Sequence, residues 1–137
     1  MLTVKGIIKL DDTGLRVILN EDFSRYYLWL IHKAYYNTIK LDRPRHGSHL
    51  SIITRALHNS CFNVEYLKQY HNQWVTLEYD PEDIRIGGRN FTNFWFPIKF
   101  PLGDLIKSQL NIVEIGFLGY HITVANNKSS VNYKCFR

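Results

Sequence analysis

The chain has 137 residues, of which 45% are hydrophobic and 15% aromatic, and it carries a formal net charge of +5. This length and composition predict one folded domain with a hydrophobic core and exclude an intrinsically disordered protein. The positive charge suits either a mildly basic surface or a polyanionic ligand such as a nucleotide or RNA, whereas no run of basic residues predicts binding to duplex DNA or to a membrane.

The cysteines and the apolar stretches further limit the kind of protein that this chain can be. Cys61 and Cys135 do not belong to a CxxC pair, which argues against structural zinc and against a disulfide scaffold. No secretory leader is expected at the start, and no apolar stretch approaches the ~20 residues that cross a bilayer. We therefore expect a reduced, cytoplasmic protein.

The first quarter of the chain predicts a hairpin followed by a helix. Residues 4–10 have the pattern of a strand, residues 11–14 (Asp-Asp-Thr-Gly) that of a turn, and residues 15–19 that of a returning strand. Apolar residues at three- and four-residue spacing then predict a helix from Asn20, as its N-cap, to about Asn37.

A strand, a mixed region and two more strands follow. The strand after the helix runs to about Thr54, and residues 55–73 are mixed, with a short helix expected near 64–70. Strands are predicted at 74–79 and 84–86, the second closed by a Gly-Gly turn.

The second half repeats the order of a helix followed by a strand. Residues 93–100 predict a strand, which Pro97 restricts to a sheet edge or a bulge. A helix is expected at 101–110, with Pro at its start, and then a strand to about Asn126 and a polar tail. The sequence therefore predicts one α+β domain over residues 1–137, built from two similar halves.

One seven-residue pattern occurs in both halves. Residues 47–53 read Gly-Ser-His-Leu-Ser-Ile-Ile, and residues 119–125 read Gly-Tyr-His-Ile-Thr-Val-Ala. Because residues two apart on a strand share a face, each His is expected beside its own hydroxyl, with the aliphatic residues in the core. The two pairs are His49 with Ser51 and His121 with Thr123. Two such strands side by side would surround one phosphate with two imidazoles and two hydroxyls.

The shorter pattern His-x-Ser/Thr is not specific by itself, because His46 and His58 also begin one. His46 lies before the strand, and the residues after His58 lack the alternation that would hold two side chains on one face. A single strand histidine is usually a half-buried residue with local hydrogen bonds. Two in matching strand contexts, His49 and His121, favour a shared site.

In these residues the chain resembles the 2H phosphoesterase superfamily, whose members carry two His-x-Ser/Thr signatures on facing strands of a bilobal fold. The first signature has Ser51 where Thr is common. The resemblance implies two halves related by a pseudo-twofold axis, each an antiparallel sheet with a helix, around a central cleft. The small size and the sequence Arg-His-Gly-Ser-His at 45–49 look most like short phage enzymes that open the cyclic oligonucleotides of the bacterial anti-phage system CBASS.

The resemblance implies a reaction as well as a fold. A cyclic di- or trinucleotide second messenger would be hydrolysed to a linear product in the host bacterial cytoplasm, without a metal or another cofactor, which would block anti-phage signalling. The residue types agree, because an imidazole titrates near neutral pH and can take or give a proton. Ser51 and Thr123 would donate hydrogen bonds to the phosphate oxygens. The sequence leaves open which His is the base.

Candidate substrate-binding residues outside the signatures are Trp74, Tyr120, Lys128 and Tyr133. Trp74 suits stacking on a base as well as it suits core packing. Tyr120 would point away from His121 in an ideal strand, which favours the core, and the aromatic run around Trp95 also favours the core. Lys128 and Tyr133 belong to a tail that would either fold over a bound nucleotide or stay frayed.

Two other functions stay open. A 2′,3′-cyclic phosphate or an RNA end would suit the same residues, and a nucleotide- or RNA-binding module would use basic and aromatic residues without turnover. The presence of both histidines and both hydroxyls favours catalysis, because a binding module would be free to lose any of them.

Overall fold

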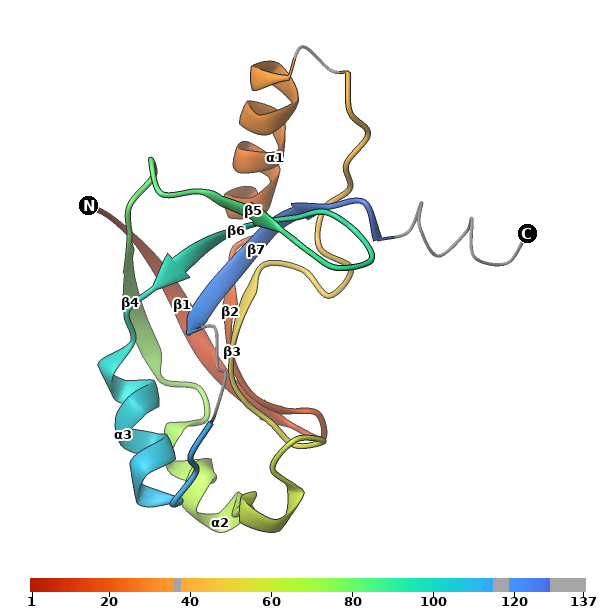
Figure 1. The fold of residues 1–137 in the computed structure, drawn as a ribbon. Coiled ribbons are helices and arrows are strands. Elements are labelled where there is room, and N and C mark those ends of the chain that lie inside the picture. The colour runs from red at the N-terminus through yellow and green to blue at the C-terminus, as the bar shows by residue number, and fades with distance from the viewer. Residues whose placement is uncertain (36–37, 115–118, 129–137) are drawn as a thin grey trace.

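The computed structural model describes residues 1–35, 38–114 and 119–128, and this part of the chain contains two antiparallel sheets (Figure 1). The first sheet has the order β3-β2-β1-β4 and is strongly curled, and the second has the order β5-β6-β7. The strands are β1 (Leu2–Asp11), β2 (Gly14–Leu19), β3 (His49–Thr54), β4 (Trp74–Tyr79), β5 (Arg85–Gly87), β6 (Asn93–Ile98) and β7 (Tyr120–Asn126). The helices are α1 (Asp22–Ala34), α2 (Val64–Leu67) and α3 (Pro101–Gln109), with 3-10 turns at Asn59–Cys61 and Lys68–Tyr70. The predicted α+β class is confirmed, and no helix in the described ranges is long and apolar enough to cross a membrane.

The β1–β2 hairpin forms where the sequence predicts it. Asp11 Oδ1 accepts hydrogen bonds from the backbone N and the hydroxyl of Thr13, which closes the turn. Ile8, Val17 and Leu50 pair in register across β1, β2 and β3, and all three are fully buried. This face of the first sheet therefore forms one wall of the core, and the alternate residues point to the opposite, open face.

Helix α1 begins later than predicted. Its N-cap is Glu21 rather than Asn20, although Asn20 Oδ1 still accepts a hydrogen bond from the backbone N of Asp22 at 2.9 Å. The helix ends at Ala34, and the predicted end at Asn37 lies outside the described residues. Asn20 and Glu21 are consecutive polar residues, and each offers a hydrogen-bond acceptor at the helix start, so residue type alone does not decide which of them is the N-cap.

Aromatic side chains join α1 to both sheets. The ring of Phe96 in β6 is fully buried and lies 4.6 Å from the ring of Tyr27 in α1 and 5.1 Å from that of Tyr79 in β4. The hydroxyls of Tyr27 and Tyr79 share a hydrogen bond of 2.6 Å. Inclined aromatic pairs add about 0.5–1.5 kcal/mol each beyond the area they bury, so this cluster fixes how the sheets pack together.

Pro97 lies in the middle strand of the second sheet rather than on an outer strand. β5 is short and pairs only with residues 93–95 of β6, so at Pro97 the strand has a partner on one side only. A bulge is present, but it lies between Phe94 and Trp95. The predicted sheet edge is therefore present only at Pro97 itself, because β5 is too short to form hydrogen bonds with that part of β6.

A half-buried ionic network joins α3 and the segment after it to the segment after β3. Glu114 accepts a hydrogen bond from Lys107 Nζ at 2.9 Å and pairs with His58 Nε2 at 2.7 Å. Burial acts to raise the pKa of Glu114, but the bonds from Lys107 and His58 outweigh it and hold the pKa below its usual value. The carboxylate therefore stabilises the fold above the usual pKa, and this contribution is lost as pH falls through the lowered pKa.

Glu114→Gln is expected to lower the free energy of unfolding by about 3 kcal/mol at neutral pH, because it removes the carboxylate that faces the buried Lys107. The difference should shrink in acid, where the wild-type carboxyl is protonated too. Urea unfolding at a series of pH values measures both effects. Glu65→Gln, in an exposed pair with Lys68, is the control, and an equal loss in both variants would contradict the role of burial.

Candidate active site

The two histidine strands meet where the sheets adjoin. β3 and β7 are each an edge strand of their own sheet, and they lie side by side (Figure 1). β3 follows a hairpin and α1, and β7 follows a hairpin and α3, so the same order of elements leads to each strand. His49 is the first residue of β3, and His121 is the second residue of β7. Residues half a chain apart are thereby brought to one junction.

Each imidazole is oriented by the glycine two residues before it. Gly47 and Gly119 have φ angles of +78° and +84°, in the left-handed region that favours glycine. Nδ1 of His49 lies 3.0 Å from Gly47 O, and Nδ1 of His121 lies 3.1 Å from Gly119 O. Because a carbonyl only accepts, Nδ1 carries a proton in both rings. In the described part of the chain neither Nε2 makes a hydrogen bond.

Gly47→Ala is expected to destabilise the fold more than Gly119→Ala. Either change places alanine at positive φ, which costs about 1–2 kcal/mol. At Gly47 the added Cβ would also clash with Glu21 Oε1, whereas at Gly119 no described residue other than the chain neighbours has an atom within 4 Å. Thermal unfolding of the two variants measures the difference, and equal losses would mean that the Glu21 carboxylate moves aside without cost.

Each histidine shares a strand face with its own hydroxyl residue, as predicted. Ser51 is exposed and Thr123 is half-buried. The alternate residues are at most 2% exposed, and they are Leu50, Ile52, Ile122 and Val124. Both signatures therefore turn their polar side chains away from the core, which is what the period of two implies.

Arg16 lies beside the first signature and was not identified from the sequence. It pairs in register with Ser51, so the two side chains extend from neighbouring positions on the open face of the first sheet. Arg16 Nη2 lies 2.7 Å from Asp11 Oδ2, and Arg16 Nε is buried without a hydrogen-bond partner in the described ranges. The alternation Leu-Arg-Val-Ile-Leu in residues 15–19 is the signal that would have placed a cation on this face.

The surroundings of His49 favour its uncharged form. Burial lowers the pKa of His49 below its usual 6.5, the charges of Arg16, His46 and His121 act in the same direction, and the hydrogen bond to Gly47 opposes them. The two imidazoles of the signatures are thus close enough for the charge of one to affect the other.

A pocket of about 130 Å³ opens beside the second signature, and it is lined by Gly87, Gly88, Asn93, Trp95, His121 and Thr123. Trp95 pairs in register with Thr123 and is only half-buried, so its assignment to the core is wrong. The cross-strand register places its side chain on the same face as the hydroxyl. Pockets that enclose a whole ligand have about 300–1,000 Å³, so this one fits a single group of a larger ligand.

The predicted substrate-binding residues lie in different surroundings. Trp74 is 71% exposed at the start of β4, so it does not belong to the core. Tyr120 is 5% exposed and faces the core, as expected for a neighbour of His121 on the strand, because adjacent residues point to opposite faces. Lys128 is exposed, with Nζ 5.4 Å from the centre of the Phe91 ring, and Tyr133 lies outside the described residues.

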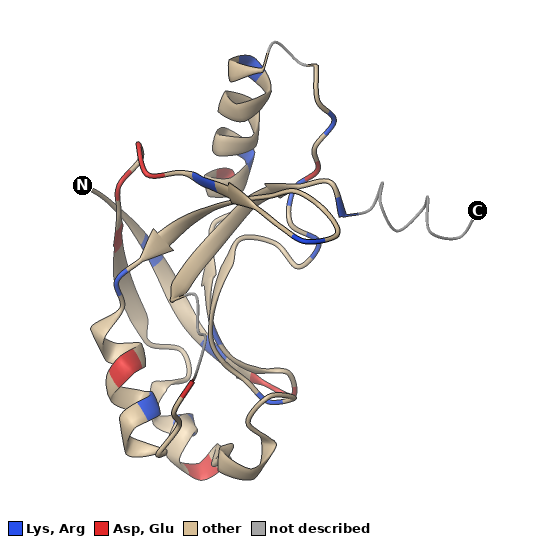
Figure 2. Ribbon diagram, viewed as in Figure 1, with Lys and Arg blue, Asp and Glu red and all other residues tan. Residues whose placement is uncertain are grey.

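Trp74 shares a sheet face with His49. The register pairs His49 with Ile18, Ile18 with Ile7 and Ile7 with Trp74, so one row of side chains crosses all four strands of the first sheet. With strands ~4.8 Å apart, the row spans about 14 Å. The neighbouring row holds Ser51, Arg16 and Lys9. Several Lys and Arg residues also lie within the segment between α1 and β3 (Figure 2).

Among the described residues, no group of three or more His, Cys, Asp or Glu side chains is arranged to hold a metal ion. The chain matches no protein-family model, no curated protein and no solved structure.

Proposed function

We propose that the protein is a phosphodiesterase that uses His49 and His121 as general base and general acid. The observation that carries this proposal is the matched orientation of the two imidazoles, each donating through Nδ1 to a glycine carbonyl and each presenting Nε2 from adjacent edge strands. Ser51, Thr123 and Arg16 add hydroxyls and positive charge for a phosphate. The bilobal arrangement of 2H phosphoesterases, with a cleft between two halves, is part of the same proposal.

In the proposed reaction His49 is the base, because burial and nearby cations lower its pKa and keep Nε2 unprotonated near neutral pH. Nε2 takes a proton from a water molecule as the water oxygen attacks phosphorus. His121 gives the proton on its Nε2 to the ribose oxygen that leaves as the P–O bond breaks. One water is consumed for each phosphodiester, which becomes a phosphomonoester and a hydroxyl. Each proton transfer contributes about 10²–10⁴-fold to the rate.

The proposed substrate is a cyclic di- or trinucleotide. The pocket at His121 fits one group, while the open face of the first sheet continues for about 14 Å from His49 to the exposed Trp74. A base stacked on Trp74 would add ~1–3 kcal/mol to binding, and Lys9 lies along the way for a second phosphate. A mononucleotide is too short to use both ends of this face. In a bacterial cytoplasm, hydrolysis of such a messenger would block anti-phage signalling of the CBASS type.

The test is incubation of the purified protein with cyclic dinucleotides, cyclic trinucleotides, 2′,3′-cyclic mononucleotides and RNA oligonucleotides with 2′,3′-cyclic ends. EDTA is present throughout, and chromatography identifies the products. Turnover of cyclic oligonucleotides that persists in EDTA supports the proposal. Trp74→Ala should weaken that turnover more than it weakens hydrolysis of a mononucleotide, because only the longer ligand reaches the ring.

Other outcomes of the same experiment have different consequences. Turnover limited to 2′,3′-cyclic phosphates or RNA ends would show that the proposed substrate class is wrong and would still support the proposed reaction. Binding without turnover would identify a nucleotide-binding module instead of an enzyme. Activity that requires an added metal would overturn the roles of the two histidines.

A further inference from the structure

The residue between Gly and His in the first signature, Ser48, is 1% exposed although its side chain is polar. Its Oγ lies 2.6 Å from Oγ of Ser24, a fully buried residue of α1, and Ser24 Oγ also lies 3.3 Å from the carbonyl oxygen of Glu21. Buried hydroxyls are rarely left without partners, so this pair fixes the turn before β3 against the first turn of α1.

The backbone around Ser48 is also engaged by hydrogen bonds. These bonds are Gly47 N to Pro44 O at 3.1 Å, Ser48 N to Glu21 Oε1 at 3.1 Å and Leu19 N to Ser48 O at 3.0 Å. The Gly47 carbonyl is the group that accepts from His49 Nδ1. Since a bond within the loop holds Gly47 N and the start of α1 and the end of β2 hold Ser48, the direction of the Gly47 carbonyl is fixed independently of the imidazole.

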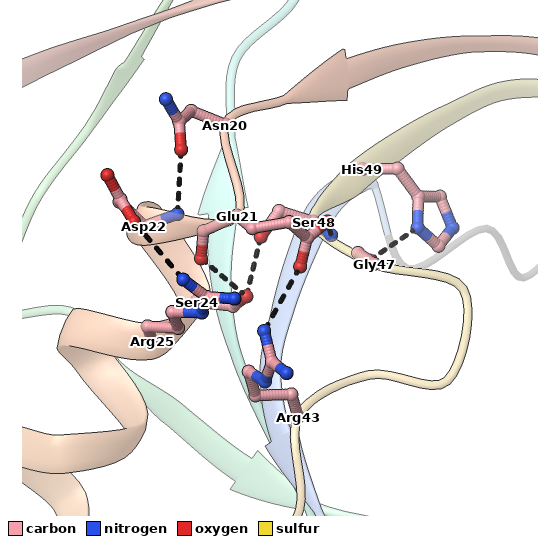
Figure 3. Close-up of polar contacts among 9 residues, drawn as sticks. All are labelled: Asn20, Glu21, Asp22, Ser24, Arg25, Arg43, Gly47, Ser48 and His49. Atoms are coloured by element: carbon pink, nitrogen blue, oxygen red, sulfur yellow. Dashed lines mark hydrogen bonds and ion pairs between the residues drawn. The ribbon is translucent and has the colours of Figure 1, made fainter.

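The Glu21 carboxylate also lies against this turn. A Cβ on Gly47 would clash with Glu21 Oε1, and Glu21 Oε2 lies 3.7 Å from Arg43 Nη1. Because Glu21 is the N-cap of α1, the helix fixes its backbone. Figure 3 shows Glu21 and Ser24 directed from the helix toward Ser48, with the His49 imidazole on the far side of Gly47.

We propose that Glu21 is a positioning residue for His49. By holding Ser48 N–H and the turn at Gly47, its carboxylate keeps the imidazole in the form protonated at Nδ1 and directs Nε2 toward the phosphate. The inference rests on the proposed function, because it explains how the proposed base is held. An imidazole free to rotate or change tautomer would present the unprotonated nitrogen only part of the time.

The second signature has a different anchor. Tyr120 takes the place of Ser48, and its ring packs against Phe100 at 5.6 Å between ring centres. Apart from the chain neighbours of Gly119, no described residue has an atom within 4 Å of a Cβ placed on Gly119. Loss of the Glu21 carboxylate is therefore expected to change the state of His49 and to leave that of His121 unchanged.

The test compares Glu21→Ala, Glu21→Gln and the control Asp22→Ala, which removes a carboxylate from the same helical turn that faces solvent. Nitrogen NMR of the histidine rings at neutral pH reports the tautomer of His49 without any substrate. Glu21→Ala should convert His49 from one tautomer to a mixture and lower kcat about 10-fold with KM nearly unchanged. Glu21→Gln keeps an acceptor oxygen for Ser48 N–H, so it should restore both properties, and Asp22→Ala should resemble the wild type.

The NMR result decides the inference independently of any activity. An unchanged His49 tautomer in Glu21→Ala would overturn it, whether or not a substrate is found. If the wild-type protein hydrolyses none of the substrates, that result would count against the proposed function alone. If Glu21→Ala does not fold, Glu21→Leu removes the same acceptor from Ser48 N–H and keeps an aliphatic side chain in its place, and a His49 tautomer unchanged in that variant would also overturn the inference.

Discussion

Replacing either His49 or His121 by Gln is expected to lower kcat for phosphodiester hydrolysis by about 10²–10⁴-fold, because each imidazole moves one proton in the proposed reaction. The double variant should lose little more than the worse single variant, since the two groups act as a unit on one bond. His121 is exposed, so its variant should change stability by about 0.5 kcal/mol or less, whereas His49 is half-buried and hydrogen-bonded, so its variant should lose about 1 kcal/mol. Steady-state kinetics and thermal unfolding measure the two properties.

His46→Gln is the matched control for these variants. His46 also begins a His-x-Ser sequence, but it is exposed and precedes β3, so its loss should leave turnover close to that of the wild type. Full activity in either signature variant would refute the two-histidine mechanism. A loss in His46→Gln as large as in His49→Gln would show that the pattern had been assigned to the wrong residue.

Arg16→Met is expected to reduce kcat/KM by about 10²-fold and to change the pH profile. The guanidinium lies beside Ser51, where it can stabilise charge on a phosphate oxygen. Its charge also helps to lower the pKa of His49, so its removal should raise that pKa toward the usual value. Because the base acts unprotonated, the acidic limb of the activity profile should move to higher pH. Measuring kcat/KM from acid to neutral pH tests both effects.

Asp11→Asn separates the charge of Arg16 from its structural contact. Hydrogen bonds from Thr13 and Arg16 lower the pKa of Asp11 to about 2, so this carboxylate is charged throughout the range of the measurement. Asn removes that charge and leaves the guanidinium in place, and activity should stay near that of the wild type. An equal loss in Asp11→Asn and Arg16→Met would mean that the ion pair matters only for the hairpin.

The strand faces of the two signatures were predictable because alternation on a strand is a local property. Leu50 and Ile122 follow their histidines and are buried, as the period of two requires. The left-handed glycines explain why the pattern begins with Gly, since Gly47 and Gly119 turn their carbonyls back toward the rings. The glycine at the start of each pattern was visible in the sequence, but the structure was needed to show that it orients the imidazole.

Ser48 and Tyr120 illustrate what a pattern of residue types misses. Both occupy the position that the repeated pattern leaves unspecified, and both are buried. Ser48 is bonded to α1, whereas Tyr120 packs in the core next to α3, so the equivalent positions contact different partners. Which partner each position meets depends on helix packing, and helix packing is not encoded in the local alternation.

The sequence by itself determined the helices, most of the strands and the two pairs of histidine and hydroxyl residues, because turn residues and the periods 2 and 3.6 act between near neighbours. Only the tertiary structure decided that Arg16 adjoins Ser51, that Trp95 lines the pocket and that β3 lies beside β7. These contacts depend on strand register and on how one sheet packs against the other. A slip of one residue in register would turn each of these side chains to the other face without changing the local sequence.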